Sequence, residues 1–164
     1  MDDEIRTERL LLRRATYQDA AAMHRIMSNP VAMRYWSTPP HANFHETQRW
    51  IASMVDGDPS QCDDFIVTLD GKLIGKLGAW QLPELGFLID PAHWGTGYAS
   101  EALTAFVARR RKLGSTEITA DLDPRNASSI RLLERHGFVA TGRASGTWQV
   151  GAELCDSVYY RLEL

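Results

Sequence analysis

The sequence predicts an α+β fold built on one mixed sheet, and three observations support this. Asp70-Gly71 separates two apolar runs, which is a strong signal for a two-residue hairpin. The apolar run at 85–89 is followed by a glycine-rich turn and a long amphipathic helix, and another strand signal follows at 117–122. A hairpin joins antiparallel strands, whereas a strand–helix–strand crossover joins parallel ones, so one sheet has to contain both. We expect about seven strands flanked by four helices.

The elements of the first quarter are a strand and two capped helices. Residues 8–14 carry an apolar run between charged flanks and are expected to form a strand. Thr16 and Asp19 have the spacing of a capping box and are expected to open a helix. Asn43 and Glu46 repeat that spacing ahead of a second helical pattern.

The remaining elements alternate between strands and helices, and glycines end the two later helices. Gly114 and Gly137 follow the helical patterns directly, where glycine adopts the left-handed conformation of a C-terminal cap without strain. In chain order we expect strands at 65–69, 73–80 and 85–89, a helix at about 98–113, a strand at 117–122, a helix from Asn126 or Ala127 to His136, and closing strands from 138 and over 154–164.

Length and composition favour one cytoplasmic domain spanning 1–164. The chain has 164 residues, a formal net charge of −3 and two cysteines. The negative charge argues against a nucleic-acid partner, and two distant cysteines do not suggest a disulfide framework or a zinc site. No apolar stretch is long enough for a signal peptide or a membrane span, so we expect no membrane partner. Either a monomer or a homodimer is compatible, since the closing strand at 158–164 could pair across a dimer.

Gly95 and Gly97, between a strand and a helix, suggest a phosphate-binding turn. Such a turn presents unpaired N–H groups at the positive end of a helix dipole. A tight connection without a ligand is a plainer explanation of the two glycines. A dinucleotide-binding turn is a second alternative, because Asp121 has about the spacing of a ribose-binding carboxylate. However, Ser100 replaces the third glycine of that motif, and only one βαβ unit is expected.

Two segments resemble the signatures of the GNAT acetyltransferases. The first is Trp94-Gly95-Thr96-Gly97-Tyr98-Ala99, which resembles the acetyl-CoA pyrophosphate loop of that family, Gln/Arg-x-x-Gly-x-Gly/Ala. The second begins at Asn126-Ala127-Ser128-Ser129 and runs to Gly137-Phe138. The segments at 7–13, 33–36 and 84–87 resemble the RimJ/RimL branch, which contains ribosomal-protein N-terminal acetyltransferases. The resemblance implies a GNAT-like three-layer fold and acetyl-CoA as co-substrate.

The resemblance also implies roles for residues outside the loop. The backbone of Phe87, Leu88 and Ile89 should pair with the pantetheine arm, Asn126 should hydrogen-bond that arm, and Ser129 should lie near the thiol and donate a proton to it. Asn126 would equally serve as a helix N-cap, and Ser129 as an ordinary first-turn serine. Trp94 departs from the Gln or Arg of the family pattern, so phosphate binding there would depend on backbone N–H groups and the helix dipole.

Glu84 is the candidate general base, because it opens the apolar strand just before the loop. A solvent-facing residue at a strand end is its plainer explanation. Tyr98, Tyr159 and Tyr160 are reserve proton donors. Neither cysteine lies in a signature segment, so direct attack in a ternary complex is favoured over a covalent intermediate.

The acceptor pocket is expected to include Tyr35, Trp36 and His41, although aromatic residues near prolines more often pack a loop onto a sheet. No metal is predicted, and the basic run 109–112 is explained most simply as a solvated helix end. The sequence thus predicts an N-acetyltransferase acting on a protein N-terminus or a small amine. The alternatives are a CoA-binding sensor without efficient turnover and an NAD(P)-binding oxidoreductase.

Overall fold

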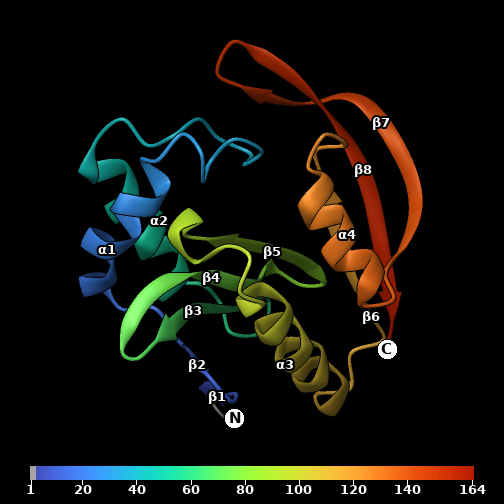
Figure 1. Cartoon of the computed structure of the whole chain (residues 1–164), viewed down its shortest axis with the longest axis horizontal. Coiled ribbons are helices and arrows are strands. Elements are labelled where there is room, and N and C mark those ends of the chain that lie inside the picture. The colour runs from blue at the N-terminus through green and yellow to red at the C-terminus, as the bar shows by residue number, and fades with distance from the viewer. Residues whose placement is uncertain (1–2) are drawn as a thin grey trace.

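A computed structural model describes residues 3–164, and in that range one mixed sheet organises the molecule (Figure 1). Its strand order is β1-β2-β3-β4-β5-β6-β8-β7. The strands are β1 (Glu4–Arg6), β2 (Leu10–Arg13), β3 (Asp63–Leu69), β4 (Lys72–Gln81), β5 (Glu84–Ile89), β6 (Glu117–Leu122), β7 (Val139–Val150) and β8 (Glu153–Glu163). The α+β class is confirmed, with one strand more than predicted. The additional strand is β1, which is too short and polar to give a hydrophobic signal.

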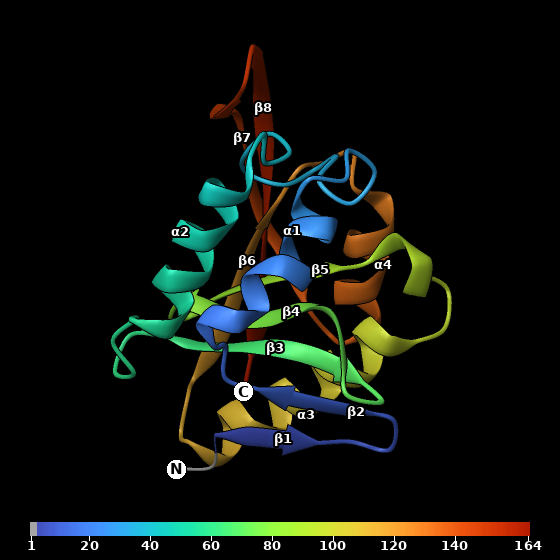
Figure 2. The same ribbon diagram turned by 90° about the vertical axis from the view of Figure 1, so that its left-hand side faces the viewer.

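Helices cover both faces of this sheet and make three layers (Figure 2). The helices are α1 (Ala20–Met27), α2 (Phe44–Val55), α3 (Tyr98–Lys112) and α4 (Ala127–Arg135). Neighbouring residues of β3 show the alternation: Phe65 packs in the cluster that contains α3 and α4, and Ile66 in the one that contains α1 and α2. Within residues 3–164, no helix combines the length and apolar character needed to cross a membrane.

Local capping and turn signals predicted the ends of several elements correctly. The side chain of Asn43 accepts a hydrogen bond from the backbone N–H of Glu46 at 3.1 Å and caps α2. Thr16 and Asp19 form the expected capping box, but its first turn is a 3-10 turn that leads into α1. At the β3–β4 hairpin, Asp70 and Gly71 have φ of 49° and 77°, as this turn requires.

The sheet opens between β5 and β6, and we call this opening the fork. The two strands are parallel and are joined by α3, which confirms the predicted crossover. Their register pairs Glu84 with Thr119 alone, and the N–H of Thr119 donates to the carbonyl of Pro83 at 3.0 Å. Beyond Glu84 the strands diverge (Figure 1). The edge of β5 that faces β6 is therefore left without a neighbouring strand over most of its length.

A long hairpin of β7 and β8 forms the C-terminal end of the sheet. β8 lies between β6 and β7, so the prediction that residues 158–164 form an exposed edge is wrong. The edge strand on this side is β7. The tip of the hairpin reaches the loop between α1 and α2, since a Cβ on Gly151 would lie 3.5 Å from Pro39.

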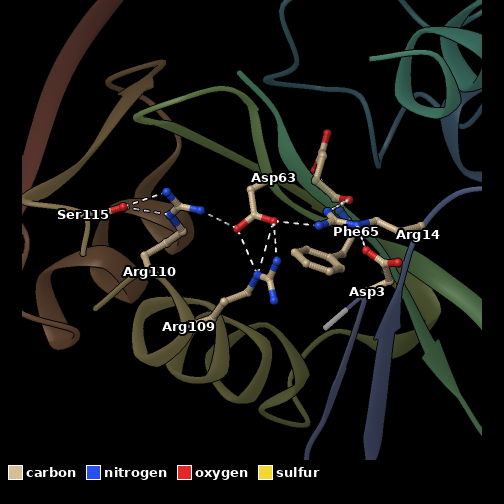
Figure 3. A network of polar contacts seen from close by, with 8 residues as sticks. Asp3, Arg14, Asp63, Phe65, Arg109, Arg110 and Ser115 are labelled. Atoms are coloured by element: carbon tan, nitrogen blue, oxygen red, sulfur yellow. Dashed lines mark hydrogen bonds and ion pairs between the residues drawn. The ribbon is translucent and has the colours of Figure 1, made fainter. Parts of the chain in front are cut away.

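A buried carboxylate fastens the C-terminal end of α3 to β3 (Figure 3). Asp63 accepts hydrogen bonds from Arg14 (3.0 Å), Arg109 (3.0 Å) and Arg110 (2.8 Å), and its side chain is 3% exposed. The side chains of Arg109 and Arg110 are only 9% and 12% exposed. For these two residues the predicted solvated helix end is wrong, because the signal lies in Asp63, 46 residues away.

Candidate active site at the fork

The glycine-rich loop follows β5 and forms the N-terminal end of α3, as the sequence predicted. Gly95 and Gly97 have φ of 76° and 83°, in the left-handed region that favours glycine. Gly97 is the N-cap of α3 and has no side chain to cap the helix. The first N–H groups of α3 therefore remain available to an anion, and a Cβ on Gly95 would meet nothing within 4 Å. This geometry fits a pyrophosphate group.

Arg9 brings a positive charge to this loop, and sequence reasoning missed it. Its Nη1 donates to the carbonyl of Thr96 at 2.9 Å, and its Nε donates to Glu101 at 2.6 Å. Its guanidinium lies 4.5 Å from the ring centroid of Tyr98. Although burial acts to raise the pKa of Glu101, hydrogen bonds from Thr7 and Arg9 outweigh it and lower that pKa. Arg9 thus offsets the one carboxylate in the first turn of α3.

Trp94 anchors the loop on the end of β5. Its indole N–H donates to the carbonyl of Ile89 at 2.8 Å, while the residue as a whole remains 52% exposed. The hydroxyl of Thr96 donates to the carbonyl of His93 at 2.9 Å and tightens the same turn. The indole N–H is therefore already used within the protein.

β5 offers one paired and one open edge. Toward β4, Phe87 is in register with Leu77, Leu88 with Lys76, and Ile89 with Gly75. Toward β6, these residues of β5 have no partner strand. An extended chain lying in the fork could therefore form backbone hydrogen bonds with this edge.

The second signature segment forms the start of α4. Asn126 is its N-cap, and its side-chain oxygen accepts a hydrogen bond from the backbone N–H of Ser129 at 3.4 Å. The capping explanation of Asn126 is thus confirmed. Among the described residues, neither the Asn126 amide N–H groups nor the Ser129 hydroxyl has a hydrogen-bond partner, so both can still meet a ligand.

Glu84 lies where the fork begins and faces a cavity of about 350 Å³. Residues of β5, β6, β7 and β8 line this cavity, including Glu84, Thr119, Asp121, Thr141, Tyr159 and Arg161. Glu84 is half-buried, and this burial, together with the negative charge of Asp121, raises its pKa. A carboxylate with a raised pKa in a cavity is suited to accept a proton near neutral pH.

The three reserve tyrosines lie in different surroundings. The hydroxyl of Tyr160 donates to Glu134 on α4 at 2.7 Å, and the ring of Tyr98 lies against Arg9. Tyr159 lines the cavity beside Glu84, with Tyr160 at its margin. Of the three, Tyr159 is the one that lines the cavity and whose hydroxyl has no hydrogen-bond partner within residues 3–164.

The three aromatic and imidazole residues predicted for the acceptor side are spread over the loop between α1 and α2. The ring of Trp36 would lie 3.9 Å from a Cβ on Gly86, so it packs beside β5. Tyr35 lies 5.7 Å from the guanidinium of Arg125, which follows β6, so this contact bridges the fork. His41 instead hydrogen-bonds the hydroxyl of Thr47 at 2.7 Å, between α1 and α2.

Proteins with similar sequences are described as acetyltransferases. A family model described as an acetyltransferase (GNAT) domain matches residues 9–139. The chain is 32% identical over 152 residues to the uncharacterized N-acetyltransferase YoaA of Bacillus subtilis (strain 168), with 84% of each chain covered. It is 28% identical over 166 residues to the uncharacterized N-acetyltransferase p20 of Bacillus licheniformis, with 95% of this chain and 93% of p20 covered.

Solved structures share the fold. A GNAT-family acetyltransferase from Bacillus anthracis matches with a TM-score of 0.84 and 26% identity over 98% of each chain. RimL, the ribosomal L7/L12 α-N-protein acetyltransferase solved in complex with coenzyme A, matches with a TM-score of 0.88 over 98% of each chain, at 17% identity.

The family match decides between the functions that the sequence left open. It covers both the glycine-rich loop and the whole of the second signature segment. Within the described strands, β5 and β6 are the one parallel pair, so the doubly wound sheet of a dinucleotide-binding fold is absent there, and the NAD(P) alternative is wrong. The chain belongs to the GNAT acetyltransferase family and is an N-acetyltransferase that uses acetyl-CoA as its acetyl donor.

Proposed function

We propose that this enzyme acetylates a primary amine by direct attack in a ternary complex, with Glu84 as the general base. The observation that carries the proposal is the position of Glu84. It occupies the single point where β5 and β6 pair, it faces the cavity, and its pKa is raised by burial and by the charge of Asp121. Donor and acceptor would meet at this point from opposite sides of the sheet.

The donor side of the proposal uses the residues around the fork. The pyrophosphate would bind the N–H groups of the loop Trp94 to Ala99, with Arg9 adding a cation beside it. The pantetheine arm would lie along the open edge of β5 at Phe87, Leu88 and Ile89. Asn126 would donate its amide N–H to this arm, since only its carbonyl oxygen is used for capping.

The chemistry needs one proton acceptor and one proton donor. The amine nitrogen would attack the thioester carbonyl, so that a C–N bond forms and the C–S bond breaks. Glu84 would take one proton from the nitrogen, directly or through a water. Ser129 would supply a proton to the departing thiolate, with Tyr159 as the second candidate because it lines the same cavity.

For the acceptor, we propose an amine that enters past Tyr35 and Trp36, with His41 held behind them by Thr47. A protein N-terminus is one candidate, since RimL acts on ribosomal L7/L12 and a related Salmonella typhimurium enzyme modifies an N-terminal serine. A small amine is the other.

We also propose that residues 1–164 form one RimJ/RimL-like domain, as a monomer or homodimer, in the cytoplasm. The two free cysteines favour a reducing compartment.

The test is the variant Glu84→Gln, assayed by release of free CoA in the presence of candidate amines. We expect kcat/KM to fall by roughly 10²- to 10⁴-fold while the affinity for acetyl-CoA stays unchanged, because the carboxylate acts on the acceptor. Glu8→Gln is the matched control, since Glu8 is exposed near the chain start. Unchanged turnover in Glu84→Gln would remove the general-base role. CoA binding without turnover of any amine in the wild type would favour the sensor alternative.

A further inference from the structure

Asp121 is a second carboxylate in the cavity, and the mechanism above does not use it. It lies on β6 opposite Tyr159 of β8. One oxygen, Oδ2, accepts a hydrogen bond from the indole N–H of Trp148 at 3.0 Å. The other, Oδ1, is buried and has no hydrogen-bond partner among the residues that the structure describes. A buried carboxylate oxygen without a donor is costly, so a ligand that supplies a donor would relieve that cost.

The strand register brings Asp121 to the same face as Glu84. Ile118, Ala120 and Leu122 of β6 pack in the core under α3 and α4, so Thr119 and Asp121 face the opposite side. Glu84 is in register with Thr119. Asp121 is therefore the diagonal neighbour of Glu84, two residues further along β6 and deeper in the fork.

The cavity holds two carboxylates, and the one arginine that lines it is paired with other acidic residues. Within residues 3–164, neither Glu84 nor Asp121 forms an ion pair. Arg161, which also lines the cavity, is directed to Glu117 at 2.6 Å and to Glu163 at 3.4 Å. The remaining titratable group at the cavity is the phenol of Tyr159, because Tyr160 directs its hydroxyl to Glu134 on α4. The local charge is negative and would attract a cationic ligand.

We propose that Asp121 selects the acceptor, accepting a hydrogen bond on Oδ1 from the ammonium group of an amine that is cationic at neutral pH. This inference rests on the proposed function. Trp148 holds Oδ2 and so fixes the carboxylate, which leaves the buried Oδ1 as the oxygen without a donor. The selected class comprises alkylamines and N-terminal α-amines, whereas neutral arylamines gain nothing from this contact.

In each turnover the ammonium nitrogen loses two protons, one to Glu84 and one that ends on the thiol of CoA. The ammonium nitrogen first gives a proton to Glu84, and its lone pair then forms the C–N bond as the C–S bond breaks. The nitrogen then gives its second proton to the Ser129 oxygen as the Ser129 hydroxyl gives its own proton to the departing thiolate, which becomes free CoA. One proton is released to solvent from Glu84 in each turnover. Asp121 holds the amine beside Glu84 throughout.

The test compares Asp121→Asn with the wild type on benzylamine, which is a cation at neutral pH, and on aniline, which is neutral. Asparagine keeps the size of aspartate and an oxygen for the Trp148 N–H. We expect KM for benzylamine to rise about tenfold or more, as for loss of a charge-assisted hydrogen bond, and KM for aniline to change little. The acid limb of kcat/KM should move to lower pH, because the Asp121 charge no longer raises the pKa of Glu84.

The control variant is Trp148→Phe, which frees Oδ2 but keeps the charge of Asp121. It should retain the preference for benzylamine and the position of the acid limb. Equal losses on both amines in Asp121→Asn, or a Trp148→Phe variant that reproduces them, would mean that Asp121 only anchors Trp148, and the inference would be rejected. If the wild type turns over neither amine, titration of benzylamine into the CoA complex of each variant decides the same question. Thermal stabilisation by acetyl-CoA reports separately on the donor site.

Discussion

At the scale of single residues, the glycine-rich loop receives a cation, Arg9, from a segment far from it in the sequence. The loop that ends in Gly97 offers N–H groups and a helix dipole, but its first helical turn also contains Glu101. A carboxylate there favours the helix, although it would repel a pyrophosphate at the same end. Arg9 pairs with that carboxylate and also holds the carbonyl of Thr96. The Arg9 side chain thus offsets the negative charge of Glu101 and holds the backbone of the loop in place.

The variant Arg9→Gln should therefore bind acetyl-CoA about tenfold more weakly, because a cation is lost and Glu101 is left without its ion pair. The salt dependence of the affinity should also become shallower, since one charge fewer contributes. Calorimetric titration at two salt concentrations measures both effects. Arg6→Gln is the matched control, because Arg6 pairs with Glu4 at the surface, away from the loop. An affinity equal to that of the control would show that Arg9 has no part in donor binding.

At the scale of elements, α3 is held at both ends by groups distant in sequence. Its N-terminal end contacts the turn between β1 and β2 through Thr7 and Arg9, which hydrogen-bond Glu101. Its C-terminal end contacts β3 through Asp63 (Figure 3). Because α3 carries the loop at one end, the second attachment sets the angle at which the helix meets the fork. Burial acts to raise the pKa of Asp63, but hydrogen bonds from Arg109 and Arg110 outweigh it and lower that pKa.

We expect Asp63→Asn to lower the free energy of unfolding by about 3 kcal/mol, because removing one partner of a buried ion pair leaves the others uncompensated. Urea unfolding at neutral pH measures this. Asp70→Asn is the control, since Asp70 is exposed in a turn that asparagine tolerates. The folded-state pKa of Asp63 lies below its unfolded value, so its contribution is present above that unfolded value and is lost as pH falls through the folded one. The difference between the variant and wild type should accordingly shrink in acid, and a constant difference would argue against the charge network.

At the scale of the whole molecule, the proposed donor site lies between the two sides of the sheet. One side comprises β1 to β5 with α1 and α2, and the other comprises β6 to β8 with α4 (Figure 1). The strands β5 and β6 pair at one register position. A ligand lying in the fork would contact both sides, so its binding energy should add to the stability of the whole fold.

We expect acetyl-CoA and CoA to raise the Tm, and NAD or ATP to raise it less. At a ligand concentration of 100 times Kd the stabilisation should be about 2.7 kcal/mol. Differential scanning fluorimetry measures the shift. Gly97→Glu is the control, because it places a side chain and a negative charge among the N–H groups that we propose bind the pyrophosphate. A shift that survives in Gly97→Glu would place the donor somewhere other than this loop.

Sequence reasoning succeeded where the signals are local. The caps at Asn43 and Asn126, the Asp70-Gly71 turn and the glycine-rich loop each depend on a few adjacent residues, and each lies where it was expected. The contacts that it missed join distant segments: Arg9 to Glu101 spans 92 residues, and Asp63 to Arg109 spans 46. The spacing of Asp121 was noticed but was connected with a ribose, because its neighbours Glu84 and Trp148 become apparent only when β5, β6 and β7 are assembled.

The fork lowers the stability of the sheet, and it also opens the edge of β5 that we propose binds acetyl-CoA. A sheet that parts at its centre forgoes the ladder hydrogen bonds that β5 and β6 would otherwise form, and water has to satisfy those groups in the free enzyme. Substitutions that bring β5 and β6 together along their length would recover these hydrogen bonds and raise the Tm. They would also fill the space in which we propose that acetyl-CoA binds. Engineering of this enzyme by Tm alone would therefore select against activity at residues 85–89, and any programme of stabilisation should leave the fork unaltered and work on the distant layers.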